Sequence, residues 1–218
     1  MKQKLYFLLG KTPTTGRWED YTSRLDVVCR LVNSRYQKHL HTDITLLADH
    51  KEIRAILLNI SRVYDIIDTI LKGIYPQKMH LVLVHDYLEN IDDINNLQGP
   101  ARDKAGPMMA QLKLEDLLFE MSVDREETDL ALSGLMNSIQ LLKQGLSPKK
   151  RRIISEYVKT GNQTQAARNL VMTQQGVSKA LKSSNWQEIR DGEKKLKRAL
   201  ELYSARLGRK QSSLDDFY

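Results

Sequence analysis

The chain has 218 residues, of which 41% are hydrophobic and 28% charged, a composition typical of a globular protein with one large domain or two small ones. Its apolar runs fall well short of the roughly 20 residues that span a bilayer, and the run behind the basic N-terminus is too short for a secretion signal. The single cysteine, Cys29, excludes an internal disulfide. We therefore expect a cytoplasmic protein with no membrane partner.

Charge is distributed unevenly along the chain. Residues 140–210 hold 17 Lys and Arg against 5 Asp and Glu, whereas residues 1–139 hold 17 against 20. A strongly basic C-terminal third favours nucleic acid or another polyanion as its partner. A well-solvated helical surface would give the same imbalance, so charge alone leaves both interpretations open.

The first half of the chain follows a layered α/β pattern. The expected elements, in chain order, are strand 5–9, helix 18–39, strand 43–47, helix 51–71 and strand 79–85. A loop at 95–109, marked by two Gly-Pro pairs, leads into a further helix, and residues 112–121 form a last strand or helix. This order predicts an α+β (α/β) layer domain over 1–122, followed by a connecting helix and linker over 123–145.

Apolar residues three or four apart define the buried faces of the two expected helices. They are Tyr21, Leu25, Val28, Leu31 and Val32 in the first helix, and Ile53, Ile56, Leu57, Ile60, Tyr64, Ile67 and Leu71 in the second. Cys29 lies within the first pattern, so we expect a buried core thiol rather than a nucleophile.

Residues 146–186 carry a helix-turn-helix pattern. Ser147 and Pro148 are typical of a helix start, and Thr160-Gly161-Asn162 of its end. The apolar face of that helix comprises Ile153, Ile154, Tyr157 and Val158. Two short helices follow, at 163–170 and 174–182, separated by a three-residue turn. This spacing is that of the helix-turn-helix unit, in which the second helix enters the major groove.

The outward positions of this unit suit double-stranded DNA. Base edges would be read by the polar positions of the last helix, namely Gln174, Gln175, Ser178, Lys179 and Lys182. Phosphates would be held by Lys149, Lys150, Arg151, Arg152 and Arg168. The alternative is a structural three-helix bundle that touches no DNA.

The C-terminus combines a long helix with a polar tail. A stripe at Trp186, Ile189, Leu196, Leu200 and Tyr203 predicts a helix over 187–207, which either packs back on the body or forms the seam of a homodimer, the reading we prefer. The tail, 208–218, is expected to be flexible. Its residues Gln211, Leu214, Phe217 and Tyr218 have the spacing of a sliding-clamp-binding box, which predicts the clamp as a partner.

The Gly10-Lys11-Thr12 sequence after the first strand is not a P-loop. That motif requires a second glycine five residues before Gly10, where Leu5 stands. His39, His41 and His50 lie close in sequence, but without cysteines they are a weak metal pattern. We expect no cofactor and no metal.

The chain as a whole, from about residue 5 to 185, resembles the SatD family, in which a small α/β domain precedes a helix-turn-helix region. In that family the first strand ends in Gly-Asp, a Ser-Arg pair and a central acidic turn follow, and Gly-Pro-Ala opens a later helix. Here Gly10 is followed by Lys11, Gly16-Arg17 stands near the Ser-Arg position, Asp49 is the acid kept in the central segment, and Gly99-Pro100-Ala101 is present.

The resemblance implies a ferredoxin-like or cyclase-like domain whose acids would hold Mg²⁺ and a triphosphate. Because Lys11 cannot ligate a metal, we expect a non-catalytic remnant, with Lys11, Arg17 and Asp49 as the degenerate site and a Lys11–Asp49 contact in place of the metal. The alternatives are a plain strand-end loop with Thr12, Thr14 and Thr15 capping the next helix, or a nucleotide-binding sensor or nucleotidyl-transfer enzyme with an accessory helix-turn-helix.

Overall fold

The structure, a computed structural model, divides into two compact units. The first unit comprises Met1–Asn137 and Leu196–Tyr218, and the second comprises Ser138–Lys195. The described backbone covers residues 2–12, 18–47 and 51–215, and the side chains are described at 2–12, 21–47 and 51–209. In this part of the chain no helix is both long and apolar enough to cross a membrane.

The first unit is an α+β fold. Its elements are β1 (Gln3–Lys11), α1 (Trp18–Tyr36), the short 3₁₀ helix η1 (Gln37–His39), β2 (Leu40–Leu47), β3 (Glu52–Leu57), α2 (Val63–Ile74), β4 (His80–Leu88), α3 (Pro100–Leu114) and β5 (Phe119–Ser122). Helices α4 (Glu126–Gln144) and α8 (Trp186–Asp215) each have residues in both units.

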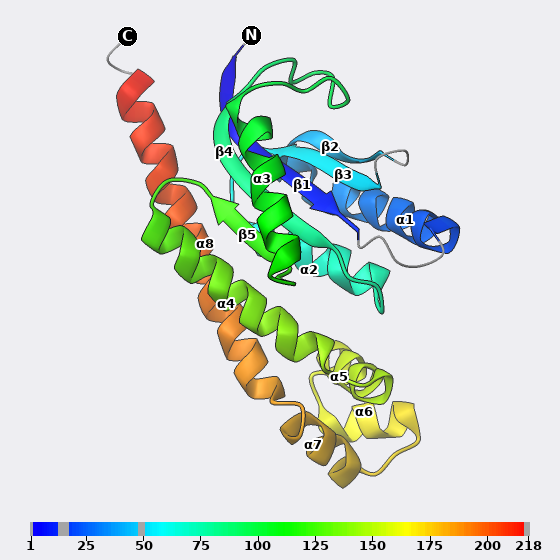
Figure 1. Ribbon diagram of the computed structural model, residues 1–218. Helices are drawn as coiled ribbons and strands as arrows, with labels where there is room; N and C mark the ends of the chain where they lie inside the picture. Colours follow the sequence, from blue (N-terminus) through cyan, green and yellow to red (C-terminus); the bar gives the residue numbers. More distant parts are fainter. Residues whose placement is uncertain (1, 13–17, 48–50, 216–218) are drawn as a thin grey trace. The chain divides into compact units, whose positions relative to one another are not determined.

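The strands form a mixed sheet with the order β2-β3-β1-β4-β5 among the described residues. The β2–β3, β1–β3 and β1–β4 pairs are antiparallel, whereas β4 and β5 are parallel. Helix α3 packs on one face of the sheet, and α1 and α2 lie together on the other (Figure 1). The expected mixed α/β layer is therefore confirmed at this level.

Alternation along β1 separates the two faces of the sheet. Phe7 and Leu9 belong to the core beneath α3, where they meet Ala101, Ala105 and Met109 of that helix. Small alanines let α3 approach the sheet closely. Because the next residue on this face is Lys11, the α3 side of the sheet becomes polar where β1 ends.

The helix expected at 51–71 is wrong. Residues Glu52–Leu57 form strand β3, and the helix that follows, α2, begins at Val63. The apolar residues 53, 56, 57 and 60 fit a helical stripe, but here they are buried as strand residues and as the Ile60 turn. The spacing of apolar residues could not distinguish a helix from a strand here, because a central strand buries both of its faces.

Helix α1 follows its predicted face with one exception. Tyr21, Leu25, Val28 and Val32 are buried, whereas Leu31 is 50% exposed. Cys29 is buried, as expected, and burial raises the pKa of its thiol to about 12, with the Asp26 carboxylate adding to the effect. The thiol therefore stays protonated at neutral pH.

The second unit contains α5 (Pro148–Thr160), α6 (Gln163–Leu170) and α7 (Gln174–Lys182), with the bounds that the sequence predicts. The core between them comprises Leu146, Ile153, Ile154, Ala166, Ala167, Val177 and Leu181. Val158 was expected on the inner face of α5, but its side chain is 58% exposed, whereas Tyr157 is half-buried and packs against the core.

Helix α8 is longer than the sequence predicts. It continues to Asp215, so the backbone of residues 208–215, which the sequence analysis assigned to the tail, is helical. Gly208 weakens a helix by only about 1 kcal/mol, which an established helix tolerates. Of the expected stripe, Ile189, Leu196, Leu200 and Tyr203 are buried within the single chain, and Trp186 is half-buried. The homodimer stays a prediction.

Candidate DNA interface and candidate ligand pocket

Side-chain caps delimit the three short helices of the second unit. The Ser147 hydroxyl accepts from the Lys150 N–H at 3.3 Å, and the Asn162 carboxamide oxygen accepts from the N–H groups of Thr164 and Gln165. The Thr173 hydroxyl accepts from the Gly176 N–H at 3.1 Å. Each cap satisfies orphan donors at a helix start, which explains why the predicted bounds are accurate.

One residue in the turn between α6 and α7 has a strained backbone conformation. Val171 ends α6 in the left-handed conformation, with φ 54°, and its side chain is 93% exposed. A β-branched residue is disfavoured there because its side chain crowds the backbone. The Met172 N–H nevertheless donates to the carbonyl oxygen of Ala167 at 2.9 Å, which closes the turn.

The outer face of α7 is polar and basic. Gln174, Gln175, Lys179 and Lys182 are exposed, and Ser178 is half-buried. The same five residues, with Ser183, line a shallow hollow on the surface. The Gln174 amide donates to the Gln163 side chain at 2.8 Å, so part of its capacity is already used within the unit. Gln175, Lys179 and Lys182 are exposed and carry polar groups of the kind that the predicted base contacts require.

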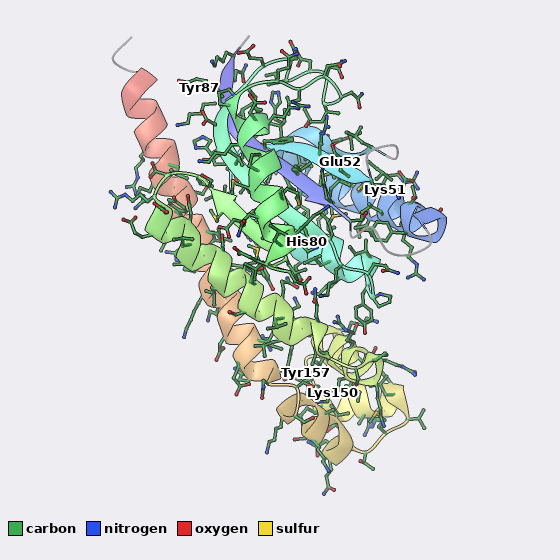
Figure 2. The ribbon with its side chains drawn as sticks, viewed as in Figure 1. Lys51, Glu52, His80, Tyr87, Lys150 and Tyr157 are labelled. Carbon is green, nitrogen blue, oxygen red and sulfur yellow. The ribbon has the colours of Figure 1, made fainter. Side chains whose placement is uncertain are left out.

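The five expected phosphate contacts divide into two groups. Lys149, Arg152 and Arg168 are exposed. In contrast, Lys150 donates to the carbonyl oxygen of Ser183 at 2.6 Å, and Arg151 donates to the carbonyl oxygens of Leu146 and Lys143. Lys150 therefore stabilises the end of α7 and Arg151 the end of α4, roles that sequence spacing does not reveal (Lys150 is labelled in Figure 2).

Residues 146–182 contain eight Lys and Arg against a single acid, Glu156. Glu156 accepts from the Asn169 amide at 2.7 Å and lies 3.6 Å from the Lys159 ammonium. Its charge is thus partly neutralised in place. The exposed surface of these three helices is left with a strong positive potential.

A second polar site lies where β1 ends in the first unit. The register places Lys11 opposite Glu52 of β3 on one side and His80 of β4 on the other (Figure 2 labels Glu52 and His80). The Lys11 ammonium lies 3.1 Å from Glu52, and the Arg54 guanidinium donates to the other Glu52 oxygen from Nε at 2.7 Å. Glu52 is only 3% exposed, so two cations offset the cost of burying its charge.

These residues form one wall of a pocket of about 310 Å³ beside α3. The pocket is lined by Phe7, Leu9, Lys11, Glu52, Arg54, Arg102, Asp103 and Gly106. The Arg54 Nη1 donates to the carbonyl oxygens of Ile94 and Asn95, both at 3.1 Å, so this side chain is fixed in place. The pocket thus combines apolar residues with a charged wall in which Arg54 is held in place.

The degenerate site proposed from sequence is only partly visible. Lys11 lies at the pocket, but Arg17 and Asp49 are outside the described residues, as are Thr14 and Thr15. The partner of Lys11 in the structure is Glu52. Sequence reasoning missed Glu52 and Arg54 because it assigned them to a helix, and a strand that is buried on both faces has no periodic pattern that could have found them.

No cluster of three or more metal-ligating side chains occurs among the described residues, which exclude His50. For the expected clamp-binding tail, Gln211 and Leu214 lie within the backbone of helix α8. Phe217 and Tyr218 lie outside the described part of the chain. The clamp motif therefore stays a prediction.

No protein-family model and no curated protein matches the chain. Among solved structures, the chain is similar to the regulator of polyketide synthase expression from Bifidobacterium adolescentis, with 10% identity over 92% of this chain and 86% of that chain, and a TM-score of 0.25. At that score the two folds cannot be equated, and the likeness carries no functional inference.

Proposed function

We propose that this chain is a DNA-binding protein in which α7 lies in the major groove of double-stranded DNA and the first unit is a non-catalytic accessory domain. The observation that carries the proposal is the outer face of α7. It presents two glutamines, one serine and two lysines without an acid, on the second helix of a capped helix-turn-helix. A purely structural three-helix bundle has no need for such a face.

The exposure of the basic side chains indicates which of them can contact the phosphate backbone of DNA. Lys149 and Arg152 at the start of α5, and Arg168 on α6, are exposed and can approach phosphates. Lys150 and Arg151 belong to the internal hydrogen bonding of the unit. We therefore assign three cations to the phosphate backbone instead of the five expected from sequence.

The accessory domain is proposed to be ferredoxin-like. What supports this is the strand order β2-β3-β1-β4 with antiparallel neighbours, and the succession β1-α1-β2-β3-α2-β4, which is the split βαβ arrangement. Lys11 at the end of β1 is paired with Glu52, a poor setting for a metal, which supports a non-catalytic role. Membership of the SatD family stays a hypothesis.

The test is selection of sequences bound by the full-length chain from a random duplex library, followed by titrations of the selected and scrambled duplexes at several salt concentrations. We expect affinity to fall steeply between about 50 and 200 mM salt as counterions are released. Gln175→Ala and Lys179→Ala should each reduce the preference for the selected sequence by about 1–3 kcal/mol.

Two arginine substitutions, compared side by side, distinguish the loss of a phosphate contact from the loss of one positive charge anywhere on the protein. Arg152→Ala should weaken binding to both duplexes alike and lower the salt slope by about 1. Arg30→Ala removes the same charge from an exposed position on α1 and should leave both quantities unchanged. Absence of salt-dependent binding at low salt, or equal effects of the two variants, contradicts the proposal.

A further inference from the structure

The helix beside the pocket, α3, contains two residues that are unfavourable inside a helix. Gly106 and Pro107 lie in the middle of α3, which spans Pro100–Leu114. In a helix interior, glycine costs about 1 kcal/mol and proline about 3 kcal/mol relative to alanine. Proline also has no N–H, so the carbonyl oxygen of Asp103 lacks its usual donor four residues on. Such local conflicts tend to occur at functional sites.

Gly106 keeps one side of the pocket open. A Cβ added at this position would meet no heavy atom within 4 Å, and Gly106 lines the pocket. Every other residue in a helix would place a side chain there. The absence of a side chain is therefore what leaves this wall of the pocket free for a ligand.

The pocket carries an excess of positive charge. Its lining includes the cations Lys11, Arg54 and Arg102 against the carboxylates Glu52 and Asp103. Arg54 is only 11% exposed and is committed to Glu52 and to two loop carbonyls, whereas Lys11 and Arg102 are 37% and 49% exposed and can turn to a ligand.

Lys113, about two helical turns beyond Gly106, is not among the residues that line the pocket, but its charge adds to the positive potential near Lys11. Burial lowers the pKa of its ammonium, and the Lys11 charge lowers the pKa further, against the opposing effect of Glu52. An anion bound beside Lys11 would offset this repulsion.

We propose that this pocket binds a small organic anion, with an apolar ring or chain against Phe7 and Leu9 and a carboxylate or phosphate group facing Lys11 and Arg102. The volume of about 310 Å³ lies at the lower end of the range for small-molecule sites, which suits a single ring with one anionic group. The site goes beyond the proposed DNA contacts, which involve the second unit alone.

The experiment uses the full chain and three probes of similar size: benzoate, phenyl phosphate and benzylamine. Ligand-detected NMR titrations should give dissociation constants of about 1 mM for one or both anions, a usual affinity for ligands of this size, and no saturable binding for the cation. Comparing benzoate with phenyl phosphate distinguishes a carboxylate site from a phosphate site. Equal binding of benzylamine overturns the proposal.

Gly106→Leu should fill the pocket and weaken anion binding at least tenfold while leaving the helix intact, because leucine is a better helix former than glycine. The matched control is Gly134→Leu, a helical glycine of α4 whose added Cβ also meets nothing within 4 Å and which lies outside the pocket.

Lys11→Met should weaken the binding of both anions about tenfold. Unchanged anion binding in Gly106→Leu overturns the proposal, and since no DNA is used, failure here is distinct from failure of DNA binding.

Discussion

At the scale of single residues, Val171 is the clearest conflict between sequence and backbone. Its left-handed conformation costs a non-glycine residue about 1–3 kcal/mol, and its 93% exposed side chain gains almost no burial in return. The turn between α6 and α7 needs this conformation because it ends one helix and aims the next. The second unit is therefore less stable than a glycine at this position would allow.

Val171→Gly should raise the free energy of unfolding of the second unit by about 1 kcal/mol, because glycine adopts the left-handed conformation without strain. Urea denaturation followed by circular dichroism measures the change. Val158→Gly is the matched control: it is also an exposed valine, but inside helix α5, so the same substitution should destabilise by about 0.5 kcal/mol. Two changes of the same sign would contradict the assignment of strain.

At the scale of elements, the α1–α2 pair shows how one small residue sets the distance between two helices. A Cβ added at Gly73 of α2 would lie 2.2 Å from Cγ2 of Val28 on α1, closer than any real contact. The two helices cover one face of the sheet together (Figure 1). Their close approach buries Val28 almost completely, at 6% exposure.

Gly73→Ala should destabilise the first unit by about 1–3 kcal/mol, because the extra methyl group forces the helices apart or the valine out of its rotamer. Adding Val28→Ala should recover part of this loss, since the two substitutions act on one contact. Gly134→Ala, in open space on α4, should be neutral or stabilising by up to about 1 kcal/mol. Thermal unfolding of Gly73→Ala, Val28→Ala, their double variant and Gly134→Ala tests the set, and simple additivity of the Gly73 and Val28 changes would contradict the packing argument.

At the scale of the whole molecule, the charge of +7 arises entirely in the smaller unit. Ser138–Lys195 holds 12 Lys and Arg against 4 Asp and Glu, whereas the first unit holds 22 against 23. A polyanion is therefore attracted to the second unit, and the nearly neutral first unit contributes little to steering. This division of charge favours the proposed DNA contacts of the second unit.

The stability of the first unit should depend on pH through His85. Burial lowers the pKa of this imidazole below 6.5, and Lys4 lowers it further, against the Val123 carbonyl and the Asp86 and Asp124 carboxylates. Below about pH 6.5 the unfolded chain binds a proton that the folded chain does not. The free energy of unfolding should therefore fall as the pH drops from about 6.5 to the folded-state pKa.

The matched variant is His85→Phe, which keeps a ring to stack on Tyr6, now 4.1 Å away between ring centroids, but cannot titrate. Urea denaturation between about pH 5 and 8 should show a smaller loss of stability at acidic pH in this variant than in the parent chain. His41→Gln, at an exposed position, should behave as the parent does. An identical pH dependence in the parent and His85→Phe would exclude His85 as the cause.

The sequence by itself determined the helices of the second unit, because their starts and ends are set by local chemistry. Ser147, Asn162 and Thr173 cap the helices with their own side chains, and Gly161 ends α5 with a positive φ. These interactions join residues two to four positions apart, so the pattern contains all the information needed. The outer face of α7 follows directly from the same spacing.

Only the tertiary structure decided the strand at Glu52–Leu57 and the pocket beside α3. A strand buried on both faces has no periodic signature, and its identity depends on pairing with β1, about 45 residues earlier in the chain. Likewise, the Lys11–Glu52–Arg54 contacts and the opening at Gly106 exist because distant segments meet. Arg151 looks like a phosphate contact in the sequence, yet nearby carbonyls take up its donors. Local capping can be read along the chain, whereas long-range pairing is decided by which surfaces the folded chain brings together.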